Sequence, residues 1–292
     1  MKLLFIVNPI AGKGYTVKAV PIIEDFCRNR GIEYSIQLTR GPGDATNIAK
    51  DQSRGYSAVI AAGGDGTVLE VANGLTETDI PLGILPLGSG NDFARAMNIP
   101  VGFSRLEEAL SIITGKAPSL VDLARFNGRV FLNVASVGFD AEIVRGLHQI
   151  KRFVKGKAAY LISVFIRLLT YKPKDINLSI DGKCISAKIF LTAVCNGISY
   201  GGGLLVNPNG STTDGMLDVI LIKPVPRYMV PFLLFKFAKG KYLDLPFVTT
   251  FKCKEVKISS NESLAVNVDG EWPLNTPVSF GLSPLSLKVY RN

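Results

Sequence analysis

Three glycine-rich segments with acidic and hydroxyl side chains are the part of this chain best suited to chemistry. They are residues 8–14 (Asn-Pro-Ile-Ala-Gly-Lys-Gly), 63–67 (Gly-Gly-Asp-Gly-Thr) and 88–92 (Gly-Ser-Gly-Asn-Asp). Glycine at a turn lets backbone N–H groups approach an anion without a Cβ in the way. Asp65 and Asp92 lie inside these segments, and carboxylates beside phosphates are favourable when a divalent cation lies between them. The segments therefore predict a site for a metal–nucleotide complex and for phosphoryl transfer.

Each glycine-rich segment follows an apolar run and precedes a helical pattern, and these elements must bring the three segments together. Strands are expected at 3–7, 33–39, 58–62 and 82–87. Helices are expected at 17–27, where Pro21 should kink or shorten the helix, at 44–53, at 67–75, from about 91, and at 104–114, where Ser104 and Glu107 form a capping box. This alternation predicts a parallel sheet, and its strand ends and helix N-termini favour a phosphate ligand.

The second part of the chain has a different pattern, with short apolar runs of period two separated by turn signals. The runs are residues 130–137, 176–180, 187–195, 217–222, 255–258, 264–268 and 285–289. They predict an antiparallel β-sandwich, interrupted by a helix at about 157–169. We place the domain boundary near residue 125, giving domains 1–125 and 126–282, and the last strand, 283–292, can return to complete the first domain.

Composition excludes several other classes of protein. The chain has 292 residues, 47% of them hydrophobic, which is ample for a packed core, and a formal net charge of +9 suits an anionic partner. A single histidine, His148, excludes a multi-histidine metal site, and the four cysteines form no Cys-x-x-Cys pair. Neither a P-loop motif nor a Gly-x-Gly-x-x-Gly motif opens the first helix. Without a secretory signal or a long apolar run, a cytoplasmic protein is expected.

The motifs together resemble one family. Gly63–Thr67 resembles the GGDGT signature shared by diacylglycerol kinases, sphingosine and ceramide kinases, NAD kinases and, more remotely, phosphofructokinases. Four further segments resemble the lipid-kinase branch. They are residues 85–95 (Leu-Pro-Leu-Gly-Ser-Gly-Asn-Asp-Phe-Ala-Arg), 8–12, 214–218 and 269–271. The resemblance covers nearly the whole chain and is strongest to the soluble bacterial diacylglycerol kinases. It implies a Rossmann-like α/β nucleotide-binding domain, a C-terminal antiparallel β-sandwich domain, and an active site in the cleft between them.

The resemblance also assigns roles to matching positions. It implies that Glu271 is the general base for the lipid hydroxyl, and that Asp65 and Asp92 organise water and the catalytic Mg²⁺. A second, structural Mg²⁺ is implied at Ser211, Asp214 and Met216, where the first and last ligands are backbone carbonyls. ATP is implied to bind at Asn8, Pro9, Ile10, Ala11, Gly12, Lys13, Thr39, Gly64, Asp65, Gly66, Thr67, Val68, Leu69, Glu70, Ser89 and Asn91. Family members often carry Thr at Ser89 and Asn at Leu69, and the second departure weakens the assignment of Glu70.

The resulting hypothesis is an ATP- and Mg²⁺-dependent kinase that phosphorylates the free hydroxyl of a lipid, with diacylglycerol as the expected substrate and phosphatidic acid as the product. The alternatives are an NAD kinase and a catalytically inactive nucleotide-sensing protein that binds membranes. The sequence leaves open whether the substrate is diacylglycerol, monoacylglycerol, phosphatidylglycerol or a sphingoid base, and a homodimer is implied only by resemblance.

Two segments suggest transient peripheral contact with a membrane. Residues 228–248 combine apolar side chains with lysines, and Lys151, Arg152, Lys155 and Lys157 precede the apolar stretch 158–169. A helix with a solvated basic face is an equally good interpretation of the same residues. No nucleic-acid partner is expected, because no nucleic-acid-binding motif accompanies the positive charge.

Overall fold

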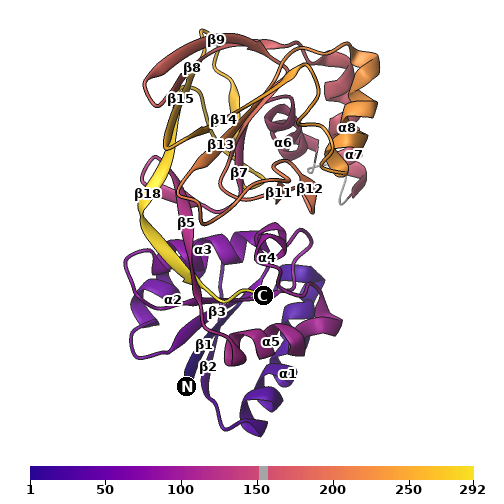
Figure 1. Cartoon of the computed structure of the whole chain (residues 1–292). Coiled ribbons are helices and arrows are strands. Elements are labelled where there is room, and N and C mark those ends of the chain that lie inside the picture. The colour runs from indigo at the N-terminus through magenta and orange to yellow at the C-terminus, as the bar shows by residue number, and fades with distance from the viewer. Residues whose placement is uncertain (151–156) are drawn as a thin grey trace. The chain divides into compact units, whose positions relative to one another are not determined.

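The computed structural model describes residues 1–150 and 157–292, together with the side chains outside 147–161 and 271–273. Lys151, Arg152 and Lys155 therefore lie outside the described residues, as do the side chains of His148, Lys157 and Glu271. The chain divides into two compact units. The first comprises Met1–Leu123 and Ser283–Asn292, and the second comprises Ala124–Leu282 (Figure 1).

The first unit is built on a parallel sheet whose strand order is β2-β1-β3-β4. Its strands are β1 (Lys2–Val7), β2 (Glu33–Leu38), β3 (Ala58–Gly63) and β4 (Leu82–Pro86), close to the predicted ranges. The end of β18 (Val278–Val289) lies beside β4, where Val289 is opposite Leu82. Leu3–Val7 and all of β3 and β4 are buried, which explains why these strands are continuous apolar runs and do not alternate.

Helices follow the strands of this sheet. They are η1 (Ala11–Gly14), α1 (Tyr15–Asn29), α2 (Asp44–Gln52), α3 (Asp65–Leu75), α4 (Asp92–Ala96), η2 (Phe103–Arg105) and α5 (Leu106–Gly115). Two local expectations were wrong, namely that Pro21 would shorten the first helix and that Ser104 and Glu107 would form a capping box. α1 continues through Pro21 for a further two turns, and Ser104 lies inside η2 without capping α5, where Arg105 and Glu108 form an ion pair.

The second unit contains two layers of strands. One sheet has the order β14-β13-β10-β7-β16-β17, and the other continues from β18 through β15 and β8 to β9. β5 (Ser119–Phe126) begins in the first unit and ends in the second. The further strands are β6 (Arg129–Phe131), β7 (Val134–Gly138), β8 (Lys174–Ile180), β9 (Lys183–Ile189), β10 (Leu191–Cys195), β11 (Ser199–Tyr200), β12 (Leu204–Leu205), β13 (Leu217–Ile222), β14 (Val248–Cys253), β15 (Glu255–Ser259), β16 (Ala265–Val268) and β17 (Glu271–Asn275). Pairing among β7 to β10 and β13 to β18 is antiparallel. The expected fold class, an α/β domain followed by an antiparallel sheet domain, is confirmed.

Helices cover one face of the first of these sheets, as Figure 1 shows at the right of this unit. They are α6 (Phe139–Ile150), α7 (Lys157–Thr170), η3 (Arg227–Met229) and α8 (Val230–Ala238). Along β13, Leu217, Val219 and Leu221 face the core shared with the other sheet, whereas Ile220 and Ile222 belong to the core beneath the helices. The sheet is therefore buried on both faces. Part of its second face is covered by α6, a helix that the sequence pattern did not predict.

None of the helices in the described ranges is both long enough and apolar enough to span a membrane.

Candidate active site

The three glycine-rich segments meet at the carboxyl ends of β1, β3 and β4. Asn8, which follows β1, donates its Nδ2–H to the hydroxyl oxygen of Thr67 at 3.1 Å. The backbone carbonyl of Asn8 accepts a hydrogen bond from the Thr16 hydroxyl at 2.6 Å. These bonds tie the first segment to the second and to the start of α1, so residues 59 positions apart in the sequence lie together as expected.

The segments approach each other so closely that only glycine fits at two positions. A Cβ added to Gly12 would lie 2.0 Å from the backbone oxygen of Leu87, and Gly12 has a φ of +56°. A Cβ added to Gly88 would lie 2.3 Å from the Cα of Gly64. Backbone thus packs directly on backbone here, as glycine without a Cβ allows.

Asp65 holds the third segment in place. Its carboxylate accepts backbone N–H groups from Asn91 at 2.7 Å, Asp92 at 2.6 Å and Phe93 at 3.3 Å. These are N–H groups at the start of α4, which have no partner within the helix. Burial raises the pKa of Asp65 and the nearby charge of Asp92 raises it further, against the lowering effect of the three hydrogen bonds.

The carboxylates of Asp65 and Asp92 converge on Gly90. A Cβ placed on Gly90 would lie 2.6 Å from Oδ2 of Asp65 and 3.1 Å from Oδ2 of Asp92. The two carboxylates therefore lie near each other beside Gly90, and Mg²⁺ in kinase sites binds through one or two carboxylates, with waters and phosphate oxygens as the other ligands. No group of three or more His, Cys, Asp or Glu side chains that could hold a metal ion occurs among the described residues. Asp65 and Asp92 offer the one or two carboxylates through which a Mg²⁺ ion binds in kinase sites.

Glu70 and Val68 have structural partners. Glu70 accepts the backbone N–H of Gly43 at 2.9 Å and that of Ala45 at 3.2 Å, so its carboxylate caps the first turn of α2. The side chain of Val68 is buried in the core. Thr39, at the end of β2, is also buried, and its N–H donates to the carbonyl of Val7. Of the proposed ATP-binding residues 64–70, those at the start of the segment thus remain the better candidates.

A pocket of about 500 Å³ opens beside the first and third segments. It is lined by Gly12, Lys13, Tyr15, Leu87, Gly88, Ser89, Gly102, Phe103 and Ser104. The sequence analysis missed Tyr15 and Phe103, whose ring centroids lie 5.5 Å apart with the ring planes inclined at 50°. Tyr15 directly follows the first glycine-rich segment, whereas no local signal marks Phe103, which lies outside all three segments.

The proposed second metal site lies in a turn of the second unit. The Asp214 carboxylate accepts the N–H of Met216 at 3.2 Å, and the Ser211 hydroxyl oxygen accepts the N–H of Thr213 at 3.2 Å. Lys252 on β14 places its Nζ 2.5 Å from Oδ2 of Asp214 and 3.5 Å from Oδ1 of Asp218. Hydrogen bonding to Asp214 raises the pKa of Lys252. A lysine ammonium thus already compensates the charge of this turn.

The turn before Glu271 is rigidly held. Asp269 accepts the backbone N–H groups of Leu132, Asn133 and Val134 at 2.8–3.0 Å, and both Asp269 and Gly270 have positive φ. The turn delivers Glu271 to the first position of β17, opposite Val268. Asp269 is a structural anchor that the sequence analysis noted only as part of a motif.

Comparison with known proteins agrees with these features. Residues 2–126 match the family described as the diacylglycerol kinase catalytic domain, and residues 133–291 match the YegS C-terminal NAD kinase beta sandwich-like domain. A diacylglycerol kinase of Bacillus subtilis is 31% identical, and the match covers 94% of this chain and 91% of that protein. The crystal structure of a putative diacylglycerol kinase from Bacillus anthracis superposes with a TM-score of 0.79 at 28% identity, covering 100% of this chain and 95% of that one.

An NAD kinase from Archaeoglobus fulgidus, solved in complex with ATP, shares the fold at 14% identity, with a TM-score of 0.54 and coverage of 100% of this chain and 94% of that one. Both matches extend through both units, but the diacylglycerol kinase of Bacillus subtilis reaches 31% identity against 14% for the NAD kinase, and the diacylglycerol kinase catalytic domain matches residues 2–126. The chain is therefore a kinase that belongs to the diacylglycerol kinase family of lipid kinases.

Proposed function

We propose that the protein transfers the γ-phosphate of ATP to the free hydroxyl of diacylglycerol, giving phosphatidic acid, with Mg²⁺ as the cofactor. It would act from the cytoplasm and meet its substrate at the membrane surface. The observation that carries this proposal is the meeting of three glycine-rich segments beside the Asp65–Asp92 pair, in a chain of this family.

Three features of the first unit support ATP as the proposed phosphate donor. A volume of about 500 Å³ is in the range of small-molecule sites. Tyr15 and Phe103 supply aromatic faces for an adenine ring. The peptide groups around Gly12 and Gly88 suit the phosphates, and the exposed Lys13 adds a cation at the same pocket.

Asp65 and Asp92 are proposed to act on the charge of the triphosphate. When bound, Mg²⁺ would neutralise phosphate charge, which is a major part of catalysis in phosphoryl transfer. Asp65 also fixes the backbone of residues 91–93, so it would position the segment that carries Asp92. Both carboxylates are needed in ionised form, and their mutual repulsion is relieved by a cation.

Glu271 is proposed as the base that accepts the proton of the lipid hydroxyl as the new P–O bond forms. Its backbone position follows a turn that Asp269 holds through three hydrogen bonds, and such a turn limits how far the residue can move. The second Mg²⁺ at Ser211, Asp214 and Met216 remains part of the proposal. It would have to displace Lys252 from Asp214.

The experiment is ATP-dependent phosphate transfer in mixed micelles with Mg²⁺. The acceptors are diacylglycerol, monoacylglycerol, phosphatidylglycerol, a sphingoid base and soluble NAD. The controls are EDTA, Glu271→Gln, and Glu255→Gln, which makes the same change at an exposed carboxylate on β15.

Transfer to diacylglycerol that is abolished by EDTA and by Glu271→Gln, but not by Glu255→Gln, is the expected result. Transfer to NAD alone would overturn the lipid substrate. Transfer by Glu271→Gln at the wild-type rate would overturn the proposed base. Binding of ATP without transfer to any acceptor would contradict the proposed activity and favour a nucleotide-sensing protein.

A further inference from the structure

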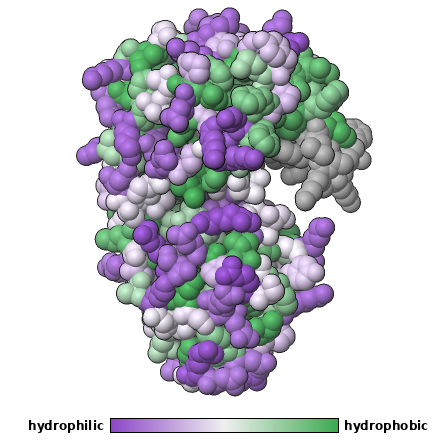
Figure 2. Space-filling model, turned by 45° about the vertical axis from the view of Figure 1, so that its right-hand side comes forward, coloured by the Kyte–Doolittle hydropathy of each residue, from purple (hydrophilic) through white to green (hydrophobic). Residues whose placement is uncertain are grey.

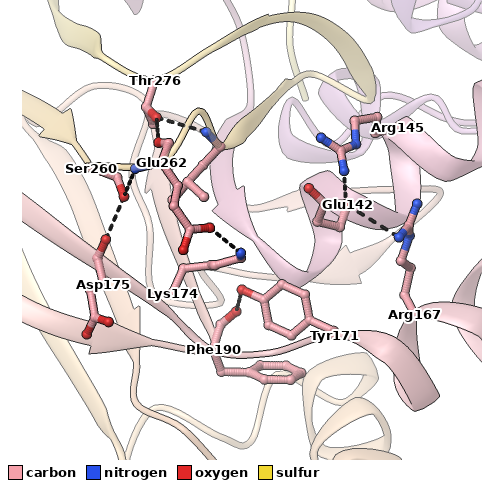
Figure 3. Close-up of polar contacts among 11 residues, drawn as sticks. Glu142, Arg145, Arg167, Tyr171, Lys174, Asp175, Phe190, Ser260, Glu262 and Thr276 are labelled. Atoms are coloured by element: carbon pink, nitrogen blue, oxygen red, sulfur yellow. Dashed lines mark hydrogen bonds and ion pairs between the residues drawn. The ribbon is translucent and has the colours of Figure 1, made fainter.

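Helix α7 exposes four large apolar side chains to solvent, and polar contacts on its opposite side hold it in that orientation. Ser163 and Arg167, one turn apart, face α6, where the Ser163 hydroxyl donates to the carbonyl of Ile143 at 2.8 Å. Arg167 lies 3.7 Å from Glu142, which also pairs with Arg145 at 2.8 Å (Figure 3). These contacts fix the rotation of the helix about its own axis.

A further bond anchors the end of the same inward stripe. Tyr171, one turn beyond Arg167, donates its hydroxyl to the carbonyl of Phe190 at 2.8 Å, which Figure 3 also shows. Since positions 163, 167 and 171 share one face of a helix, the opposite face must point outward. That face carries Ile162, Phe165, Ile166 and Leu169, with exposed fractions of 40, 63, 41 and 54%.

Helix α8 continues the same kind of surface. Its inner face, Val230, Leu233 and Phe237, packs in the core to which Val164 and Leu168 of α7 also pack, so the two helices belong to one layer. Its outer face exposes Phe232 and Phe235, and Tyr228 of η3 is also exposed. The exposed apolar residues of α7, η3 and α8 are called the α7–α8 surface below. Figure 2 shows an apolar area on this unit, next to the grey atoms.

The charged side chains that contact the exposed rings of α8 are lysines. Lys236 lies over the ring of Phe232 at 5.4 Å and Lys239 lies over the ring of Phe235 at 4.2 Å. Lys172, Arg227 and Lys241 are also exposed in or beside the same helices, and residues 226–242 contain no Asp or Glu. A contiguous apolar area rimmed by cations is typical of interfacial binding to anionic lipid.

We propose that the α7–α8 surface docks the protein on an anionic lipid bilayer, with Phe165 and Phe235 inserted among the acyl chains and the lysines against the headgroups. A second copy of this chain is a poorer occupant, because symmetrical pairing would set the same cations against each other. The biological use of this surface rests on the proposed lipid substrate, whereas its binding to vesicles requires no catalysis.

The test is flotation of the full chain with vesicles, without ATP or diacylglycerol. Vesicles of phosphatidylcholine with phosphatidylglycerol are compared with vesicles of phosphatidylcholine alone. Phe165→Ser/Phe235→Ser is compared with Leu120→Ser/Leu285→Ser, which removes two exposed apolar residues from the first unit. Lys236→Gln/Lys239→Gln is compared with Lys183→Gln/Lys188→Gln, two exposed lysines on β9. Urea unfolding checks that every variant is folded.

Wild type should bind the anionic vesicles and should bind neutral ones weakly. Phe165→Ser/Phe235→Ser should lower the affinity about 30-fold, Lys236→Gln/Lys239→Gln should remove most of the dependence on phosphatidylglycerol, and both control pairs should bind as wild type. The proposal is overturned if the phenylalanine variant binds as wild type or if wild type binds no vesicle. It is also overturned if the phenylalanine variant only dissociates a dimer, since the surface would then be a self-interface.

Failure of this proposal can be told apart from failure of the proposed function. Vesicle binding without transfer to any lipid would leave the docking surface standing and refute the substrate. If the protein phosphorylates diacylglycerol in micelles but the surface variants bind vesicles as wild type does, the substrate stands and the docking surface is refuted.

Discussion

Gly12 is the residue whose replacement most directly tests the glycine-rich site. Alanine at position 12 would have to adopt a φ of +56° and would place its Cβ 2.0 Å from the Leu87 oxygen. The left-handed conformation alone costs about 1–2 kcal/mol. Real Cβ atoms essentially never come within 3.0 Å of another atom, so residues 12 and 87 must separate by at least about 1 Å. Such overpacking costs a further ~1–3 kcal/mol.

Gly14 offers a matched control in the same loop. It too has a left-handed φ, of +88°, but no atom lies within 4 Å of its Cβ position. Gly14→Ala should therefore lower the free energy of unfolding by about 1–2 kcal/mol, and Gly12→Ala by about 2–5 kcal/mol. The difference between the two variants measures the close approach alone.

The assays are urea unfolding and steady-state kinetics with ATP varied. A displacement of about 1 Å between two loops of one site is expected to lower kcat/KM for ATP about 100-fold in Gly12→Ala. Gly14→Ala should lose less than about tenfold. Equal losses of stability and of kcat/KM in the two variants would refute the reasoning. The close approach of residues 12 and 87 would then contribute nothing to stability or to the use of ATP.

Three further perturbations follow from individual contacts. Burial raises the pKa of Asp140 above its ordinary 3.8, so the folded state holds this proton more tightly and the wild type loses stability as pH rises through the folded pKa. Asp140→Asn should therefore gain stability relative to wild type above about pH 4, by up to ~1.4 kcal/mol per pH unit in urea unfolding. The same change of unfolding free energy with pH in both proteins would contradict this. Lys252→Met should lower the free energy of unfolding by less than about 1 kcal/mol, since Lys252 is half exposed. Mg²⁺ should raise the Tm of this variant more than the Tm of wild type, because Asp214 is then free to bind the ion. An equal rise in Tm would show that Asp214 holds no cation. Phe103→Ala should raise the KM for ATP about tenfold and leave that for the lipid unchanged, and an unchanged KM for ATP would remove the ring from the nucleotide site.

The sequence predicted the first unit well because its signals are local. Buried strands such as residues 3–7 are apolar throughout, and each glycine-rich segment follows such a strand directly. Parallel connectivity then requires the three segments to meet at one sheet edge. The contact between Asn8 and Thr67 is what this reasoning expects.

The sequence could not predict the roles of side chains that have two possible partners. The pattern around Glu70 is the same whether its carboxylate meets a nucleotide or caps a neighbouring helix, and only the packing of α2 on α3 brings the N–H of Gly43 to it. Lys252 is 38 residues from Asp214, and the pairing of β13 with β14 decides that its ammonium lies against that carboxylate. Nothing in the local sequence of either residue contains this information.

The sequence by itself determined the fold class, the order of strands and helices in the first unit, and the segments that bear glycine and aspartate, because backbone conformation and apolar periodicity act over a few residues. The tertiary structure alone decided which way each helix faces. The apolar stretch 158–169 fits a core helix or a membrane surface equally well, and the inward bonds of Ser163, Arg167 and Tyr171 turn its apolar side out. Those partners come from α6 and from the residue before β10, 19 to 25 residues away, and long-range contacts of this kind form only when the chain has folded.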